Sequence, residues 1–173
     1  MGVLIPAAES AIEKTMNKKI AVIATEGTVS SGAFIRELKK LDPKVEVLQK
    51  TAPLLVSIVE SGEQNSAISR LALNNYLTPL IKKGVDTIIL GCTHYGIIQD
   101  EIRAITGKVA LIAEGKVAAK KLKDYLCRHP EIEKKLSQNK KIKFLSTDRS
   151  EKFQKLGSVF FGRTIRPQRI TLR

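Results

Sequence analysis

The chain has 173 residues, of which 43% are hydrophobic, and a mean hydropathy of −0.08. This composition is typical of a globular protein with room for one full core, and it excludes an intrinsically disordered chain. No apolar run approaches the roughly 18 residues that cross a bilayer, and residues 1–8 are too short and too uncharged for a signal peptide. We therefore expect a cytoplasmic protein without a membrane partner.

The formal net charge is +13, and most of it lies in the last third of the chain. Residues 1–113 carry 13 Lys and Arg against 11 Asp and Glu, a charge of +2, whereas residues 114–173 carry 17 against 6, a charge of +11. A basic block of this kind can bind nucleic acid. Its lysines are spread over polar helix faces with few aromatic residues between them, which favours a solvated surface over a nucleic-acid partner.

Short apolar runs alternate with longer amphipathic segments along the chain. This alternation predicts an α/β fold with a doubly wound parallel sheet. The first run, at residues 2–5, has the pattern of a buried strand that starts abruptly, so we expect the chain to be part of a longer one. Further strands are predicted at 20–24, 45–48, 87–90, 109–112 and 142–145, and helices at 8–17, 31–40, 64–82, 96–105, 116–127, 131–137 and 149–160.

The charge balance changes near residues 113–115, which we take as a domain boundary. The prediction is a first α/β domain at 1–113 and a basic helical and strand segment at 114–173. The longest predicted helix contains Pro79, which is expected to kink or end its last turn. Apolar residues recur at helical spacing in that helix at Ile68, Leu71, Ala72, Tyr76 and Leu80.

Four reactive side chains directly follow the apolar run at residues 88–90. They are the thiol of Cys92, the hydroxyl of Thr93, the imidazole of His94 and the phenol of Tyr95. A thiol at the carboxyl end of a buried strand is a candidate proton carrier, because a neighbouring imidazolium or a helix amino end converts it to a thiolate.

Two other predicted strands end in polar segments. Thr25 and Thr28 follow the strand at 20–24, and a loop with Pro53 and Glu60 follows the strand at 45–48. Parallel strands end at one edge of their sheet, so we expect these side chains to meet Cys92 in a pocket. The same residues also have structural interpretations, which the residues alone leave open: apolar filler for the cysteine, a solvated carboxylate for Glu60 and helix capping for the threonines.

A metal site and a hydrolase are the chemical alternatives. Cys127 and His129 repeat the Cys-x-His spacing of Cys92 and His94, so these four side chains could supply zinc ligands. A one-residue gap is tighter than the usual zinc spacing, and we expect no metal. A Cys-His hydrolase would need an orienting residue and an oxyanion hole, for which the sequence offers no candidate.

Residues 90–95, Leu-Gly-Cys-Thr-His-Tyr, closely resemble the second catalytic motif of the glutamate racemases. These cofactor-independent enzymes supply D-glutamate for bacterial peptidoglycan. The resemblance extends over nearly the whole chain. Its other segments are 2–8, 23–29, 52–56 with Glu60, Thr147 with Asp148, and 160–162.

The resemblance implies a two-base racemisation without pyridoxal phosphate, metal or other cofactor. One cysteine removes the α-proton of glutamate, and a second returns a proton to the opposite face. Cys92 matches the second cysteine, and His94 matches the histidine that assists this thiol. The residues that match substrate-contacting positions are Thr93, Thr25, Thr28 and Glu60, the last lying near the ammonium group or the histidine.

The family's first cysteine belongs to an amino-terminal half that has no counterpart here, and Cys127 lies in a different context. We therefore expect the carboxyl-terminal part of a racemase, inactive alone, whose segment 114–173 packs on the missing amino-terminal domain. Lys116 follows Glu114 and Gly115 where the family has an aspartate-containing turn. Apolar surface left uncovered would favour a homodimer or poor solubility. The residues expected to be uncovered are Val117, Leu122, Leu126, Phe144, Phe160 and Phe161.

Two rival functions remain at this stage. A racemase of the same fold that acts on aspartate or hydantoins is the nearest, and His94 with Tyr95 favours glutamate over it. The other is a binding module that uses the basic tail on nucleic acid, which steeply salt-dependent retention on DNA would reveal.

Overall fold

Four parallel strands form a sheet in the first part of the chain. The computed structural model describes residues 2–137, 139–147 and 151–172, which divide into two compact units, Met1–Arg128 and His129–Arg173. The sheet of the first unit has the strand order β2-β1-β3-β4, and all pairs are parallel. This confirms the predicted fold class. The strands are β1 (Lys19–Ala24), β2 (Glu46–Thr51), β3 (Thr87–Gly91) and β4 (Ala110–Ala113).

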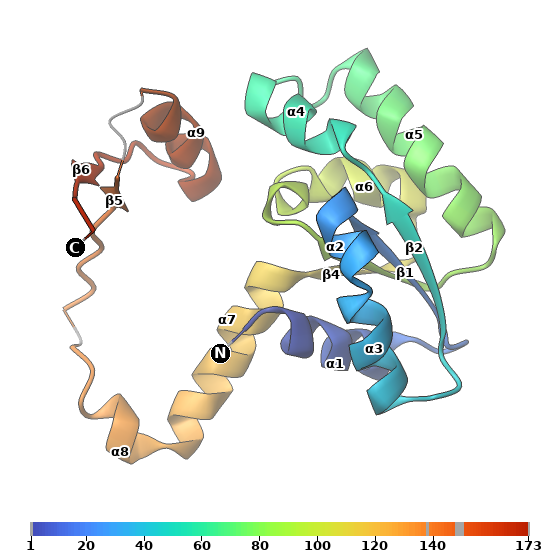
Figure 1. Ribbon diagram of the computed structural model, residues 1–173, viewed down its shortest axis with the longest axis horizontal. Coiled ribbons are helices and arrows are strands. Elements are labelled where there is room, and N and C mark those ends of the chain that lie inside the picture. The colour runs from blue at the N-terminus through green and yellow to red at the C-terminus, as the bar shows by residue number, and fades with distance from the viewer. Residues whose placement is uncertain (1, 138, 148–150, 173) are drawn as a thin grey trace. The chain divides into compact units, whose positions relative to one another are not determined.

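Helices cover both faces of this sheet (Figure 1). One face carries α1 (Leu4–Lys14), α3 (Ala33–Leu41) and α7 (Glu114–Arg128), and the other carries α4 (Leu54–Ser61), α5 (Ala67–Lys82) and α6 (Gln99–Thr106). Alternate residues of a strand point to opposite faces. In β3, Ile88 and Leu90 accordingly enter the core beneath α4 and α5, while Ile89 enters the core beneath α1 and α3.

The strand order creates a switch point between β1 and β3. From β1 the chain crosses to β2 on one side, and the later strands are added on the other side. Open α/β sheets bind their ligands beyond the carboxyl ends of the strands at such a point. Ala24 of β1 pairs with Gly91 of β3, so Thr25 and Cys92 leave the sheet next to each other.

Gly91 allows the two strands to end in close contact. A β-carbon at this position would lie 3.1 Å from Cβ of Ala24 and 3.2 Å from Cε2 of Phe34. Both neighbours are buried, so a larger residue would force the strand end outward. The glycine therefore fixes where the chain leaves β3 to reach Cys92.

The strand predicted at residues 2–5 is wrong, because α1 begins at Leu4. Pro6 lies in the first turn of this helix, where a missing N–H costs little. The helix is held by a face of small residues, Ala7, Ala8 and Ala11, which are completely buried against the sheet. Val3 and Ile5, which suggested a buried strand, are exposed.

The loop predicted around Pro53 and Glu60 is also wrong, because this segment forms α4. Leu55, Ile58 and Val59 are buried at helical spacing. Gly62, with a φ of 79°, ends the helix in the left-handed conformation that glycine tolerates. The segment after β1 is likewise helical, since α2 (Glu26–Ser31) starts directly after Thr25.

Helix α5 confirms the longest predicted helix, with a different buried face. Ala72, Tyr76 and Leu80 are buried as expected, but Ile68 and Leu71 are 64% and 74% exposed. The helix continues through Pro79 to Lys82. Its last turns are held against the core by Tyr76, Leu77 and Leu80, and this packing outweighs the loss of one backbone hydrogen bond.

The first compact unit extends beyond residue 113, where the charge change had placed a boundary, to residue 128. Helix α7 belongs to this unit because it packs on α1. Val117 contacts the core, and Nζ of Lys121 lies 3.0 Å from Oε2 of Glu9 and 3.6 Å from Oε1 of Glu13. The charge change therefore marks the polar outer face of a packed helix.

The second unit contains short elements. They are α8 (Pro130–Glu133), β5 (Leu145–Ser146), α9 (Glu151–Phe161) and β6 (Gln168–Arg169). β5 and β6 pair in parallel, and only two residues near the strand predicted at 142–145 are extended into a ladder. Ile165 is buried, and its side chain occupies the space where a β-carbon of Gly157 would lie.

Of the apolar side chains expected to be uncovered, Leu122, Phe160 and Phe161 are exposed, while Val117, Leu126 and Phe144 are partly buried. Asp148 and Arg149, which belong to the resembled carboxyl-terminal segment and to a predicted helix start, lie outside the described residues. Within the ranges that the structure describes, no helix is both long enough and apolar enough to cross a membrane.

Candidate active site

A thiol, an imidazole and a carboxylate form a row at the carboxyl edge of the sheet. Sγ of Cys92 lies 3.6 Å from Nδ1 of His94, and Nε2 of His94 lies 3.3 Å from Oε1 of Glu60. The two ring nitrogens of His94 thus face different partners. A carboxylate at Nε2 favours the tautomer with the proton there, which leaves Nδ1 free to accept a proton from the thiol.

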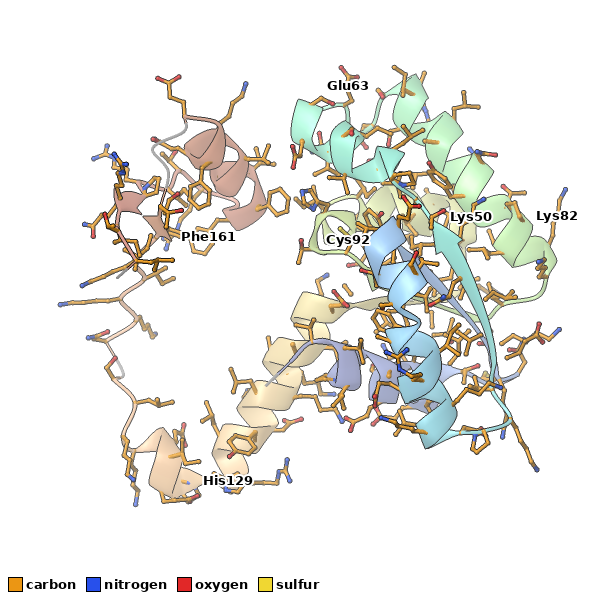
Figure 2. All side chains as sticks on the ribbon, in the orientation of Figure 1. Lys50, Glu63, Lys82, Cys92, His129 and Phe161 are labelled. Carbon is orange, nitrogen blue, oxygen red and sulfur yellow. The ribbon has the colours of Figure 1, made fainter. Side chains whose placement is uncertain are left out.

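Three elements place this row. Cys92 (Figure 2) is the first residue beyond β3. His94 lies in η1 (Thr93–Gly96), the short 3₁₀ helix that follows. Glu60 lies in the last turn of α4, so its position depends on a helix where the sequence predicted a loop. Tyr95, which is completely buried, donates a hydrogen bond of 2.8 Å from its hydroxyl to the carbonyl of Ala52 and ties η1 to the segment before α4.

The two predicted threonines lie on the neighbouring strand end. The hydroxyl oxygens of Thr25 and Thr28 are 3.2 Å apart, and both side chains are half-buried. Because Ala24 pairs with Gly91, Thr25 and Cys92 are the first residues beyond two neighbouring strand ends. Thr93 is exposed beside Cys92. The fold thus brings all six predicted site residues to the same edge of the sheet.

The environment of Cys92 favours the protonated thiol. Burial raises the pKa of Cys92 above its ordinary value, and the nearby Glu114 carboxylate raises it further, while hydrogen bonds from the backbone N–H groups of His94 and Tyr95 oppose the rise. This direction is opposite to the lowered pKa that an imidazolium neighbour would produce. The sulfur of Cys92 therefore carries its proton at neutral pH.

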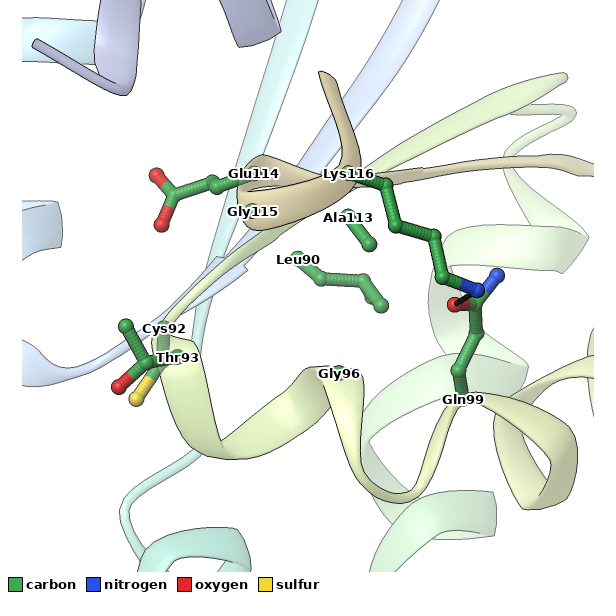
Figure 3. Close-up of a pocket in the computed structure, with 9 residues that line it drawn as sticks. All are labelled: Leu90, Cys92, Thr93, Gly96, Gln99, Ala113, Glu114, Gly115 and Lys116. Atoms are coloured by element: carbon green, nitrogen blue, oxygen red, sulfur yellow. Dashed lines mark hydrogen bonds between the residues drawn. The ribbon is translucent and has the colours of Figure 1, made fainter. Parts of the chain in front are cut away.

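A cavity of about 180 Å³ opens beside Cys92, between η1 and the start of α7 (Figure 3). Lys116 and Gln99 close one end of it, where Nζ of Lys116 donates a hydrogen bond of 3.2 Å to Oε1 of Gln99. Cys92 and Glu114 lie toward the other end. Further lining is provided by Leu90, Thr93, Gly96, Ala113 and Gly115.

Glu114, Gln99 and Lys116 were not among the predicted site residues. Glu114 follows β4 directly, just as Cys92 follows β3, so the rule that strand ends converge could have found it. Gln99 starts α6 and carries no comparable signal in the sequence. Lys116 stands where the resembled family has an aspartate-containing turn, and that departure is its signal in the sequence.

The residues of the zinc alternative lie apart in the chain's architecture. Cys127 is in the last turn of α7 and is exposed, and Nδ1 of His129 lies 3.1 Å from Oε1 of Glu131 in the second unit. Cys127 comes 13 residues after Glu114 on the same helix, which corresponds to about 20 Å along the axis. No group of three or more potential metal ligands occurs among the described residues.

The chain thus has a parallel α/β sheet with a thiol at its switch point. The family model of the Asp/Glu/Hydantoin racemases matches residues 1–122, and the chain belongs to this family.

The similar proteins are glutamate racemases. Those of Sulfurihydrogenibium and of Neisseria meningitidis are 35% and 34% identical to it, over 99% and 95% of the chain and 63% and 61% of the relatives. The chain thus spans less than two thirds of the length of these relatives.

Solved structures give the same result. A glutamate racemase isoform from Bacillus anthracis superimposes with a TM-score of 0.87 at 31% identity and covers 99% of this chain, which in turn covers 64% of that protein. The glutamate racemase of Francisella tularensis in complex with D-glutamate has a TM-score of 0.83 at 30% identity, with 97% of this chain and 62% of that protein covered.

Proposed function

We propose that this chain carries one of the two proton-transferring sites of a cytoplasmic glutamate racemase, with Cys92 as the group that exchanges the α-proton of glutamate. The observation that carries this proposal is the row of Cys92, His94 and Glu60 at the switch point of the sheet. The similarity to glutamate racemases, one of them solved with D-glutamate, supports glutamate as the substrate.

The proposed chemistry at Cys92 is a reversible proton transfer. With its proton passed to Nδ1 of His94, the thiolate takes the α-proton of L-glutamate, and the electron pair of the C–H bond remains on the α-carbon. In the reverse direction the thiol returns its proton to that carbon. The Glu60 carboxylate stabilises the positive charge that His94 acquires while it holds the proton.

An α-proton next to a carboxylate is very weakly acidic, so a base alone is insufficient. The enolate-like transition state needs donors already aimed at its developing negative charge. The hydroxyls of Thr25, Thr28 and Thr93 are the donors that we assign to this task, because they lie at the same strand ends as Cys92. No cofactor enters this scheme.

Racemisation also requires an acid on the opposite face of the α-carbon. Cys127 is unsuited, since it lies about 20 Å along α7 from the cavity. We assign the opposing acid to the part of the relatives' length that this chain does not span, which would close over the site and exclude water.

Solvent deuterium exchange tests the proposal on this chain as it exists. In D₂O, Cys92 is expected to remove the α-proton of L-glutamate and return a deuteron to the same face, giving deuterated L-glutamate by mass spectrometry. Cys92→Ala should abolish the exchange, whereas Cys127→Ala should retain it. Exchange that persists in Cys92→Ala, or none above the protein-free background, would contradict the assignment.

The same assay settles the substrate. The family name includes aspartate and hydantoins, so L-aspartate and a 5-substituted hydantoin are the competitors. We expect exchange with glutamate to be fastest. Faster deuterium exchange with L-aspartate or the hydantoin would identify that compound as the substrate in place of glutamate.

A further inference from the structure

Glu114 and Cys92 follow neighbouring strands of the sheet and line the same cavity. Leu90 of β3 pairs with Ala113, the last residue of β4, and β3 continues one residue farther to Gly91 before Cys92. Neighbouring strands are about 4.8 Å apart, which leaves Glu114 and Cys92 on adjacent strand ends. Both side chains line the cavity, at the end away from Lys116 (Figure 3).

This carboxylate is half-buried and has no ion-pair partner in the part of the chain that the structure describes. The nearest cation in sequence, Lys116, donates to Gln99 instead. Burial raises the pKa of Glu114, as expected for a carboxyl group that loses water without gaining a positive neighbour. Its charge is therefore weakly screened toward the cavity.

Several groups face the sulfur of Cys92. His94 lies on one side, with Glu60 behind it, and favours loss of the thiol proton. Tyr95 is neutral and donates its hydroxyl proton to a carbonyl. Glu114 opposes His94, because a negative charge at the same end of the cavity makes the thiolate less favourable.

We propose that Glu114 is a positioning residue that holds the proton on the Cys92 sulfur and prevents a resting thiolate–imidazolium pair with His94. The thiol of Cys92 then stays in the proton-donating form, and loss of the Glu114 charge shifts the shared proton toward His94. The importance of this effect for racemisation rests on the proposed function. The effect of Glu114 on the Cys92 proton can be measured without that function.

Alkylation of Cys92 measures the thiolate directly and needs no glutamate. Cys92 and Cys127 fall in different tryptic peptides, residues 84–103 and 124–128, so mass spectrometry can follow each thiol separately in the full chain. In Glu114→Gln, the midpoint of the pH profile for iodoacetamide labelling of Cys92 should fall by roughly 0.5–1 pH unit. Labelling at neutral pH should rise accordingly.

Asp124→Asn is the matched control, because it removes one exposed carboxylate from the same helix, about 15 Å farther along the axis. It should leave the Cys92 midpoint unchanged. An unchanged or higher midpoint in Glu114→Gln would overturn the inference. If that variant fails to fold by circular dichroism, Glu114→Ala removes the same charge and must lower the midpoint for the inference to stand.

The outcome is separable from that of the proposed function. A lowered midpoint without deuterium exchange would keep Glu114 in this role and remove the racemase assignment. Normal deuterium exchange with an unshifted Cys92 midpoint in Glu114→Gln would keep the racemase assignment and remove the role of Glu114.

Discussion

The thiol of Cys92 lies between two influences of opposite sign. His94, 3.6 Å away, offers a place for the proton, whereas burial and Glu114 favour its retention on sulfur. A thiol that must both take and give a proton needs a second group to hold that proton, and His94 provides it, while burial and Glu114 favour its return to sulfur. Glu60 acts one step away, through the second nitrogen of His94.

Glu60→Gln is expected to slow deuterium exchange into L-glutamate at least about tenfold, because the amide cannot stabilise the imidazolium that forms when His94 holds the proton. Exchange followed by mass spectrometry is the measurement. Glu63→Gln, three residues farther on and exposed, is the control and should exchange like the parent. Equal rates in both variants would remove Glu60 from the mechanism.

Packing at one end of β3 and hydrogen bonds at the other fix the position of this strand and therefore of Cys92. At its end, Gly91 fits against Ala24 and Phe34. Before its start, Asp86 accepts hydrogen bonds from the hydroxyl of Thr15 at 2.6 Å and from the backbone N–H groups of Met16 and Asn17 at 2.7 and 2.8 Å. These contacts connect the segment between α1 and β1 to β3.

Asp86 gives the stability of the molecule a defined pH dependence. Burial opposes its ionisation, but the hydrogen bonds from Thr15, Asn17 and Met16 outweigh burial and hold the pKa of Asp86 below its ordinary value. A depressed pKa contributes stability above the unfolded value of about 3.9, and this stability is lost as the pH falls through the folded value.

Asp86→Asn should therefore lower the free energy of unfolding by about 1–3 kcal/mol at pH 7, since it replaces acceptor oxygens by an amide that meets backbone donors. Urea denaturation at pH 7 and at about pH 3 is the measurement. The difference between variant and parent should shrink at the lower pH. A difference that is constant, or larger in acid, would contradict this role.

At the scale of the whole molecule, the candidate site lies entirely in the first compact unit. Thr25, Glu60, Cys92, His94 and Glu114 all precede residue 128, and the core of that unit is formed by its own elements. The second unit supplies none of the residues described at the site.

A shortened chain that ends at Arg128 should therefore fold and retain deuterium exchange into L-glutamate. Circular dichroism on heating and the exchange assay are the measurements. Loss of the cooperative transition, or loss of exchange in a folded fragment, would show that residues 129–173 support the site.

The full 173-residue chain should exchange the α-proton without producing D-glutamate, because Cys127, the other thiol among the described residues, lies about 20 Å along α7 from Glu114. Chiral chromatography after prolonged incubation with L-glutamate is the measurement, and detectable D-glutamate would contradict the two-site scheme.

The sequence by itself determined the parallel α/β fold and the convergence of Cys92, His94 and the threonines, because strand periodicity and the common direction of parallel strands are local and topological rules. It misplaced residues 2–5 and 53–60, where short apolar runs allow more than one structure. Only the tertiary structure showed that Glu60 lies against His94 and that Glu114 lines the same cavity as Cys92. Those contacts depend on where a helix ends and on which strand ends adjoin, and both are decided by packing between segments far apart in the chain.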